Sequence, residues 1–376
     1  MKVLLAIPCL MRGGTEMQTL YLARALRESG HFVEVVCYFE HDKSVIDEFM
    51  GIGCTVSIMK LSRQISATDF VLKMKKYYQL SKPDVLHIQY MTPGALSIIA
   101  GKMAGIHHII ATVHQPYSKW HKKIWKIILR TVSVMCDYFI SVSLNVEKSW
   151  FGSCSMYDDK SEKRHFTIYN TVDVELIEKL IKSDESLKIK NDKRYDDKFV
   201  FGYIGRLSKE KGVDLLVEAF EKLYKENNDV QLLIVGDGKE RPELEAKYRS
   251  NLSWSNVVFL GRKSWDEAMK YLVLLDAVVV PSRFEGFGLT AIEAMAASKP
   301  VIAAKVGGLE EIIENNRSGL LYDAENTDDL ARKMSFIIRE KERRKVFSEN
   351  ARRRAYEFDV RRYNSIIKKL YDKLIV

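Results

Sequence analysis

The sequence predicts an α/β protein built from two doubly wound domains. Short apolar runs rich in Val, Ile and Leu alternate with segments of helical period along all 376 residues. Strands that helices cover on both faces read as continuous apolar runs, so this alternation is typical of parallel sheets with right-handed crossovers. At about 150 residues per domain, the length favours two such domains over one.

The first half of the chain predicts a sheet of its own. Six apolar runs read as strands, at residues 3–7, 33–37, 85–88, 109–113, 139–142 and 166–169. Between several of these runs, apolar residues recur at helical spacing, over residues 16–29, 67–80 and 120–135.

The second half repeats the rhythm. Its strand-like runs lie at residues 199–204, 231–235, 257–260, 277–280 and 301–304. Its helical segments lie at residues 213–226, 243–250, 266–274 and 290–297.

The polar stretch 182–198 interrupts this alternation, and we interpret it as a linker. The expected domains are therefore residues 1–190 and 198–355. Residues 356–376 are predicted to form a helix that either closes the second domain or crosses back to the first. Because ligands of such folds bind at the carboxyl ends of the strands, two facing domains predict a cleft between them.

Composition narrows the class of protein. With 47% hydrophobic residues and only 7 Pro, the chain is neither disordered nor fibrous. The 59 Lys and Arg exceed the 50 Asp and Glu by +9, which suits nucleic acid, an anionic membrane surface or a phosphorylated small molecule. Five cysteines without a C-x-x-C pair predict neither a disulfide framework nor a zinc site, and they favour a reducing cytosol. The N-terminus lacks the pattern of a signal peptide, and no apolar stretch of about 20 residues predicts a membrane span.

The strongest motif is PSRFEGFGLTAIEAMA at residues 281–296. A strand ends before it, a glycine-containing loop follows, and a helix begins near Gly288. The amide groups at a helix N-terminus favour a phosphate, and carboxylates beside it, Glu285 and Glu293, can hold sugar or ribose hydroxyls. Taken alone, the same two residues also fit a dipole partner and a solvated helix carboxylate.

A second motif, GYIGRLSKEKG at residues 202–212, follows the first strand of the second half. Arg206 and Lys211 offer a planar donor fork and a point charge, both suited to a pyrophosphate. The motif is neither a Walker A loop nor a full G-x-G-x-x-G, and basic loops of this kind are often merely solvated.

Three weaker glycine segments also follow strands. They supply flexible backbone near a helix start, and they are VGDG at 235–238, RGGTE at 12–16 with Gly14, and AKVGGLEE at 304–311 with Glu311. Each is also compatible with an ordinary turn or helix start.

As a set, these motifs resemble the family-4 retaining glycosyltransferases (glycosyltransferase group 1), which have the GT-B fold. The resemblance covers nearly the whole chain and is strongest over residues 199–325. It implies two Rossmann-like domains that face a cleft, the first binding the acceptor and the second binding a nucleotide-sugar donor. It also implies transfer of the sugar with retention of anomeric configuration.

The resemblance assigns roles to residues of the second domain. Arg206 and Lys211 would bind the donor diphosphate and stabilise the leaving group, Glu285 would contact the hydroxyls of the donor sugar, and Glu293 the ribose. The amides near Gly288 and Leu289 would flank the phosphates, and Glu311 would be a further contact on the nucleotide side.

Two assignments fall in the first domain. The amides near Gly14 would flank the phosphates and the reacting sugar, and His114, at a strand end, stands where the family often has a donor-facing histidine. Two departures from the family pattern, Thr171 in place of Gly and Glu310 in place of Pro, affect backbone geometry rather than catalytic side chains.

The chemistry suits these residue types. Cleavage of the anomeric C–O bond places charge on a diphosphate, which Lys and Arg stabilise selectively as it forms. In similar enzymes a donor phosphate oxygen is thought to deprotonate the acceptor, and Glu285 as covalent nucleophile is the less favoured version. No D-x-D triplet occurs in the sequence. We therefore expect metal independence, with no cofactor beyond the nucleotide-sugar co-substrate.

The interval 85–136 contains no Asp or Glu and predicts a basic amphipathic helix. Its basic residues share one face, namely Lys119, Lys122, Lys123, Lys126 and Arg130. Aromatic residues accompany them, namely Tyr117, Trp120 and Trp125. We expect residues 117–130 to contact an anionic membrane surface, the alternative being a core-packed helix with a solvated lysine stripe.

The leading hypothesis is thus a hexosyltransferase that uses a UDP-sugar, or else GDP-mannose, and acts on a glycan or lipid-linked acceptor in cell-surface polysaccharide biosynthesis. Its expected location is the cytoplasm, either free or peripheral at the inner face of the cell membrane. Alternatives are a nucleotide-sugar epimerase, a phosphorylase, a degenerate sugar-binding relative and a basic nucleic-acid-binding protein. The last lacks an aromatic RNA-binding signature, so we expect no nucleic-acid partner.

Overall fold

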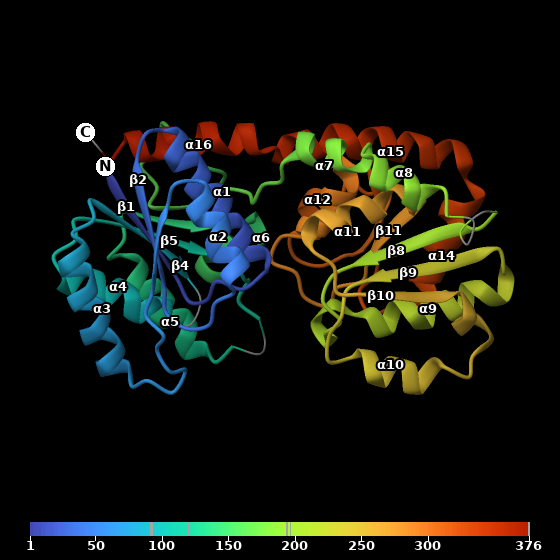
Figure 1. Cartoon of the computed structure of the whole chain (residues 1–376), viewed down its shortest axis with the longest axis horizontal. Coiled ribbons are helices and arrows are strands. Elements are labelled where there is room, and N and C mark those ends of the chain that lie inside the picture. The colour runs from blue at the N-terminus through green and yellow to red at the C-terminus, as the bar shows by residue number, and fades with distance from the viewer. Residues whose placement is uncertain (91–92, 119–120, 193–194, 196, 375–376) are drawn as a thin grey trace. The chain divides into compact units, whose positions relative to one another are not determined.

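The computed structural model describes residues 1–90, 93–118, 121–192, 195 and 197–374. The chain forms two compact units, one of Met1–Thr171 with Val360–Val376 and the other of Val172–Asp359. Figure 1 labels many of the helices and strands of both units. Each unit contains one parallel sheet, as the sequence predicts.

The first unit is built on a seven-stranded parallel sheet in the order β3-β2-β1-β4-β5-β6-β7. Its strands are β1 Lys2–Ile7, β2 Phe32–Cys37, β3 Thr55–Ile58, β4 Val85–Tyr90, β5 His108–Val113, β6 Tyr138–Ser141 and β7 His165–Thr167. Its helices are α1 Gly14–Glu28, α2 Lys43–Gly51, α3 Ala67–Ser81, α4 Gly94–Met103, α5 Lys123–Ser133, α6 Leu144–Phe151 and α16 Val360–Asp372.

Every strand predicted in the first half is present, and one further strand, β3, was not predicted. β3 has only four residues and lies at the sheet edge, where its side chains are half-buried or exposed. An edge strand packs on fewer neighbours, so its sequence lacks the continuous apolar run of a central strand.

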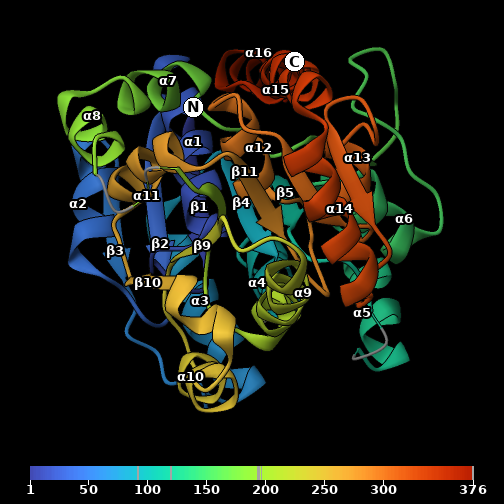
Figure 2. The ribbon, with the colours of Figure 1, turned by 90° about the vertical axis from the view of Figure 1, so that its right-hand side faces the viewer.

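The second unit is built on a six-stranded parallel sheet in the order β10-β9-β8-β11-β12-β13. Its strands are β8 Phe199–Ile204, β9 Val230–Val235, β10 Val257–Gly261, β11 Ala277–Val280, β12 Val301–Ala304 and β13 Gly319–Tyr322. Its helices are α7 Val174–Ile181, α8 Asp184–Lys190, α9 Val213–Glu226, α10 Arg241–Tyr248, α11 Trp265–Tyr271, α12 Leu289–Ala296, α13 Leu309–Ile312, α14 Thr327–Arg339 and α15 Lys341–Ala355. Figure 2 shows α14 beside the edge strand β13, and α14 also packs on α9.

The boundary between the units differs from the expected linker. The chain enters the second unit at Val172, and the stretch 182–198 lies inside that unit, where α8 packs on α11. Ser183 caps α8, and Glu185 pairs with Lys270 at 2.6 Å. A short surface helix of this kind exposes most of its side chains, so its polar composition resembles that of a linker.

The last helix, α16, belongs to the first unit. It packs on α1 and buries Ile367, Leu370 and Tyr371 in the core that also contains Leu5 and Val35. The core of the first unit is therefore assembled from both ends of the chain.

Candidate active site

In the second unit, the point where the strand order reverses lies between β8 and β11. β9 and β10 extend from one side of β8, whereas β11, β12 and β13 extend from the other. The loops after β8 and β11 leave the sheet at this point, where open α/β sheets bind their ligands. These loops carry the two strongest sequence motifs, 202–212 and 281–296.

An ion pair joins the two loops. The Nζ atom of Lys211 lies 2.7 Å from Oε2 of Glu285, and the hydroxyl of Ser282 donates to the same oxygen at 3.2 Å. The Lys211 side chain is 31% exposed and the Glu285 side chain 14% exposed, so both can still reach a ligand. The structure thus brings together two residues that lie 74 positions apart in the sequence.

A second interaction clamps the same loops. Arg283 makes two 2.7 Å bonds to the carboxylate of Asp214, and its Nη1 also donates to the Lys209 carbonyl at 2.9 Å. Burial raises the pKa of Asp214, but the bonds from Arg283 outweigh it and keep that pKa below its ordinary value. Sequence reasoning missed this clamp, although Arg283 lies within the motif, because nothing in the spacing pairs it with Asp214.

Glycines allow three loops to meet backbone to backbone. A Cβ atom on Gly212 would lie 2.1 Å from the Pro281 carbonyl oxygen, and one on Gly307 would lie 2.0 Å from the Glu285 carbonyl oxygen. Both glycines also have positive φ, +66° and +54°. The loops after β8, β11 and β12 therefore pack as closely as they do only because these positions lack side chains.

Helix α12 starts inside this loop cluster. Gly288, at φ +119°, is its N-cap and provides no side-chain cap, so the first amides of Leu289–Ala296 are open to an anion. Glu293 lies one turn further along α12, and the indole Nε1 of Trp265 donates to its Oε1 at 2.7 Å. Burial raises the pKa of Glu293, and the bond from Trp265 opposes that rise. Sequence reasoning missed Trp265.

Other predicted residues of this unit have partners outside the Lys211–Glu285 pair. The Arg206 side chain is 70% exposed and its Nη2 lies 3.5 Å from Oε2 of Glu210 rather than beside Glu285. The Tyr203 hydroxyl holds the Arg206 carbonyl at 2.7 Å. Glu311 lies in α13, and its carbonyl accepts a 2.7 Å bond from Arg354.

In the first unit, Gly14 is the first residue of α1, and Glu16 lies in that first turn. A Cβ atom on Gly13 would lie 2.6 Å from Oε2 of Glu16, which places this carboxylate beside the helix N-terminus. The thiol of Cys9 donates to the other Glu16 oxygen at 3.2 Å. Burial raises the pKa of Cys9 to about 12, so this thiol stays protonated.

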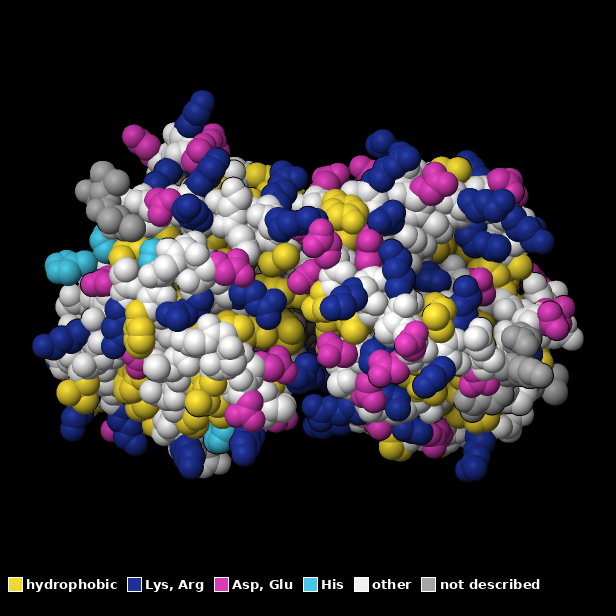
Figure 3. Space-filling model, turned by 45° about the horizontal axis from the view of Figure 1, so that its top comes forward, with side chains coloured by type: hydrophobic (Ala, Val, Ile, Leu, Met, Phe, Trp, Pro, Cys, Tyr) yellow, Lys and Arg dark blue, Asp and Glu magenta, His cyan; other side chains and the backbone are white. Residues whose placement is uncertain are grey.

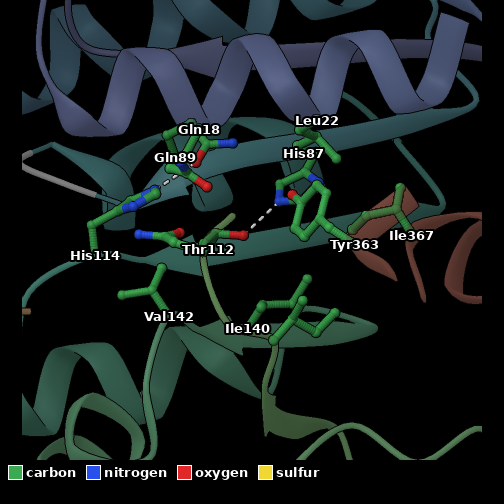
Figure 4. A pocket seen from close by; sticks show the side chains of 12 residues that line it. Gln18, Leu22, His87, Gln89, Thr112, His114, Ile140, Val142, Tyr363 and Ile367 are labelled. Carbon is green, nitrogen blue, oxygen red and sulfur yellow. Dashed lines mark hydrogen bonds between the residues drawn. The ribbon is translucent and has the colours of Figure 1, made fainter. Parts of the chain in front are cut away.

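His114 follows β5 and is nearly buried. Its Nε2 lies 2.7 Å from Oε1 of Gln89 on the neighbouring strand β4, as Figure 4 shows. Burial lowers the pKa of His114 to about 4, so the imidazole is neutral near pH 7.

A cavity of about 20 Å³ lies beside His114, with room for one water molecule. His87 lines it as well, and its two ring nitrogens lie 2.7 Å from the hydroxyls of Tyr371 and Thr112. Figure 4 draws the bond to Thr112. Gln18, also on its wall, bonds both the N–H and the carbonyl of Thr171, at 2.8 and 2.7 Å. The residue that departs from the family pattern at position 171 is therefore held firmly by α1.

The predicted basic helix is present as α5, but it begins at Lys123 rather than at residue 120. Lys119 and Trp120 lie outside the described residues. Leu129 and Val132 face the core, whereas Ile124, Trp125 and Ile127 are 50%, 49% and 60% exposed. The apolar residues near the start of α5 thus face solvent, and those near its end pack on the core.

On the face seen in Figure 3, Lys and Arg side chains alternate with Asp and Glu rather than forming one continuous basic track. Among the described residues, no cluster of three or more His, Cys, Asp or Glu could hold a metal ion. None of the helices in the same residues is long and apolar enough to cross a membrane.

Two parallel α/β units, with glycine-rich loops at the strand ends and a Lys–Glu pair at the switch point of the second, define a GT-B protein. Residues 12–176 match the family model described as Glycosyltransferase Family 4, and residues 184–354 match the model described as Glycosyl transferases group 1. The chain belongs to this family of retaining glycosyltransferases, as the motifs predict.

Similar proteins extend over most of the chain. An uncharacterized glycosyltransferase of Methanocaldococcus jannaschii is 29% identical over 338 residues, 89% of this chain and 84% of that protein. The alpha-monoglucosyldiacylglycerol synthase of Acholeplasma laidlawii is 25% identical over 359 residues, 90% of this chain and 88% of that protein. Among solved structures, HepE of Anabaena in complex with UDP-glucose has a TM-score of 0.83 at 22% identity, covering 99% of this chain and 100% of HepE.

Proposed function

We propose that this protein transfers a hexosyl group from a nucleotide sugar to a glycan or lipid-linked acceptor, with retention and without a metal ion. A UDP-sugar is the proposed donor, with GDP-mannose as the alternative. The observation that carries the proposal is the Lys211–Glu285 pair, 2.7 Å across, between the two loops at the switch point. The UDP-glucose complex of HepE supports the choice of nucleotide.

The proposed roles follow from the charges and the chemistry. As the bond between the anomeric carbon and the diphosphate breaks, its electron pair passes to the diphosphate oxygen, where Lys211 and Arg206 stabilise the charge. The acceptor hydroxyl attacks from the same side and gives its proton to a donor phosphate oxygen, which retains the configuration. Glu285 holds sugar hydroxyls, and the α12 N-terminus at Gly288 and Leu289 holds phosphate.

The remaining assignments follow the family resemblance. Glu293 is proposed to hold the ribose and Glu311 to contact the nucleotide. In the first unit, the neutral imidazole of His114 and the amides near Gly14 are proposed to contact the donor. Cell-surface polysaccharide biosynthesis in the cytoplasm, at the inner face of the cell membrane, is the proposed setting.

A nucleotide-release assay with a panel of UDP-sugars and GDP-mannose, against glycan and lipid-linked acceptors, tests the function. Lys211→Ala should lower kcat/KM about 100-fold or more while leaving the melting temperature unchanged. The matched control is Lys225→Ala, since Lys225 is 70% exposed on α9 away from the loops.

Four outcomes would contradict the proposal. Near-normal rates for Lys211→Ala would refute the proposed role of Lys211 and of the site around it. Turnover without an acceptor would indicate an epimerase, and dependence on inorganic phosphate would indicate a phosphorylase. Loss of activity with a chelator, restored by Mg²⁺ or Mn²⁺, would refute the proposal that the reaction needs no metal ion.

We also propose that α5 binds an anionic membrane surface, which suits a lipid-linked acceptor. Ile124, Trp125 and Ile127 are about half exposed, and Lys122 and Lys123 beside them are exposed too. Apolar side chains flanked by lysines are the pattern of an interfacial helix. The Acholeplasma relative is named as the synthase of a glucosylated lipid, which supports a lipid-linked acceptor for this protein.

Co-sedimentation with vesicles tests the membrane contact. Replacing Lys122, Lys123 and Lys126 by Glu should weaken binding to anionic vesicles about 100-fold, because each lysine near such a surface contributes about 1 kcal/mol. The control reverses three exposed charges on α15, at Lys341, Arg343 and Lys345. Equal binding to neutral and anionic vesicles, unchanged by the α5 substitutions, would exclude the contact.

A further inference from the structure

The carboxylate of Glu293 has one side-chain partner in the structure. The indole Nε1 of Trp265 donates to its Oε1 at 2.7 Å, from a position 28 residues earlier in the chain. Among the described residues, no other side chain forms a hydrogen bond or an ion pair with this carboxylate. Its second oxygen, Oε2, has no side-chain partner among these residues.

The backbone that carries Trp265 is anchored. Trp265 is the first residue of α11, and Ser264 and Glu267 close a capping box around this helix start, with bonds of 3.3 Å and 2.9 Å. The first turn is thus fixed on both sides of the indole. The half-buried ring reaches from this turn to α12, the helix that begins in the loop cluster.

The chemistry of the bond favours one form of Glu293. An indole N–H can only donate, so it stabilises a carboxylate but offers nothing to the O–H of a protonated carboxyl group. Burial acts in the opposite direction and raises the pKa of Glu293. Of these two effects, only the hydrogen bond can be removed by a single substitution.

We propose that Trp265 is a positioning residue, which binds Oε1 of Glu293 so that Oε2 accepts from the ribose hydroxyls of the donor nucleotide. The inference deepens the proposed function and depends on its assignment of Glu293 to the ribose. Trp265 itself need not touch the nucleotide, because its indole N–H is engaged by the carboxylate.

Titration calorimetry with UDP and GDP between pH 5.5 and 8.5 tests this role. Trp265→Phe removes the donor, so Glu293 should bind its proton at higher pH than in the wild type. At pH 5.5 the Trp265→Phe variant should bind UDP about 10-fold more weakly than the wild type does at the same pH. This difference in affinity should disappear towards pH 8.5. Taking the ratio at each pH removes the titration of the nucleotide's own phosphates.

Two further variants separate positioning from a merely structural role. Glu293→Gln should weaken binding at every pH, and adding Trp265→Phe to it should cause no further loss, because the carboxylate is already absent. Trp265→Gln, which keeps an N–H donor, should bind better than Trp265→Phe at low pH. Trp254→Phe is the matched control, since Trp254 packs against Phe259 and not against Glu293.

The outcomes are distinct. Normal binding by Glu293→Gln would refute the assignment of Glu293 itself. A loss in Glu293→Gln with none in Trp265→Phe would refute the positioning role alone. A loss in Trp265→Phe that is independent of pH and persists in the Glu293→Gln background would show that the ring only supports the fold. Thermal unfolding of each variant is measured alongside binding. If Trp265→Phe proves to be misfolded, the decisive comparison is between Trp265→Gln and the wild type.

Discussion

At the scale of single residues, the main feature of the candidate site is the ion pair between Lys211 and Glu285. Lys211 and Glu285 are both partly exposed, so their pairing contributes little to folding stability. What the pair does provide is position, because each side chain keeps the other at the junction of two loops. Under the proposed function, a donor diphosphate would share Lys211 with Glu285 without any large movement of the lysine.

The buried histidines of the first unit make its stability depend on pH. Burial lowers the pKa of His87 to about 3 and that of His114 to about 4, from an ordinary 6.5. Below pH 6.5 both histidines become protonated in the unfolded chain but stay neutral in the folded unit. The free energy of unfolding therefore falls as the pH falls from 6.5 towards 4. At pH 5 each histidine should cost about 2 kcal/mol, measured as the difference in urea unfolding between pH 7.5 and pH 5.

Replacing His114 by Gln should remove about half of this pH dependence, since His87 remains as a buried group that the unfolded chain protonates. His107, which is exposed in the same unit, provides the control. An unfolding free energy that stays constant from pH 7.5 to pH 5 in the wild type would contradict this account.

At the scale of elements, the site depends on how closely the loops after β8, β11 and β12 approach each other. Arg283 bridges two of them with a two-point bond to Asp214. Gly212 lets the first loop lie against the backbone at Pro281. These contacts join loops that are remote in sequence, and they hold Lys211 beside Glu285.

Gly212→Ala should therefore destabilise the second unit by about 3 kcal/mol, from a steric clash added to the strain of a positive φ. Gly261→Ala is the matched control, because Gly261 also has positive φ but a Cβ there would meet only Arg241, at 4.0 Å. It should cost about 1 kcal/mol. Denaturant unfolding measures both, and equal losses in the two variants would mean that the close approach at Pro281 is unimportant.

Element prediction succeeded for the central strands and failed for the edge strand β3, for the short and mostly buried strand β13, and for the surface helix α8. The central strands β1, β4, β8 and β11 are mostly buried and mostly apolar, so their sequence identifies them directly. The edge strand β3 and the surface helix α8 expose much of their side chains and therefore read as coil and linker. The start of α5 shifted by three residues, because a basic amphipathic pattern does not mark its own first turn.

At the scale of the whole molecule, the first unit is completed by the end of the chain. Ile367, Leu370 and Tyr371 of α16 are at most 1% exposed. Burying three such side chains contributes about 6 kcal/mol, which is comparable with the whole stability of a typical domain. Tyr371 also supplies the hydroxyl that bonds His87.

A chain that ends at Asp359 should therefore lose the first unit as a folded body and keep the second, which is continuous from Val172 to Asp359. Calorimetry should show one unfolding transition in place of two, and limited proteolysis should release an intact fragment that starts near residue 172. Lys368→Ala, an exposed change on the same helix, should preserve both transitions. A protease-resistant first unit in the shortened chain would show that α16 is dispensable.

The sequence by itself determined the fold class, the family and the residue types of the candidate site. Apolar periodicity and short glycine motifs are local patterns, and they remain readable without knowing which segments meet. Tertiary structure alone decided that Lys211 pairs with Glu285, that Arg283 clamps Asp214, that Trp265 reaches Glu293 and that α16 completes the first unit. These contacts join residues 28 or more positions apart, and such distances are set by strand order and packing, which no local pattern records.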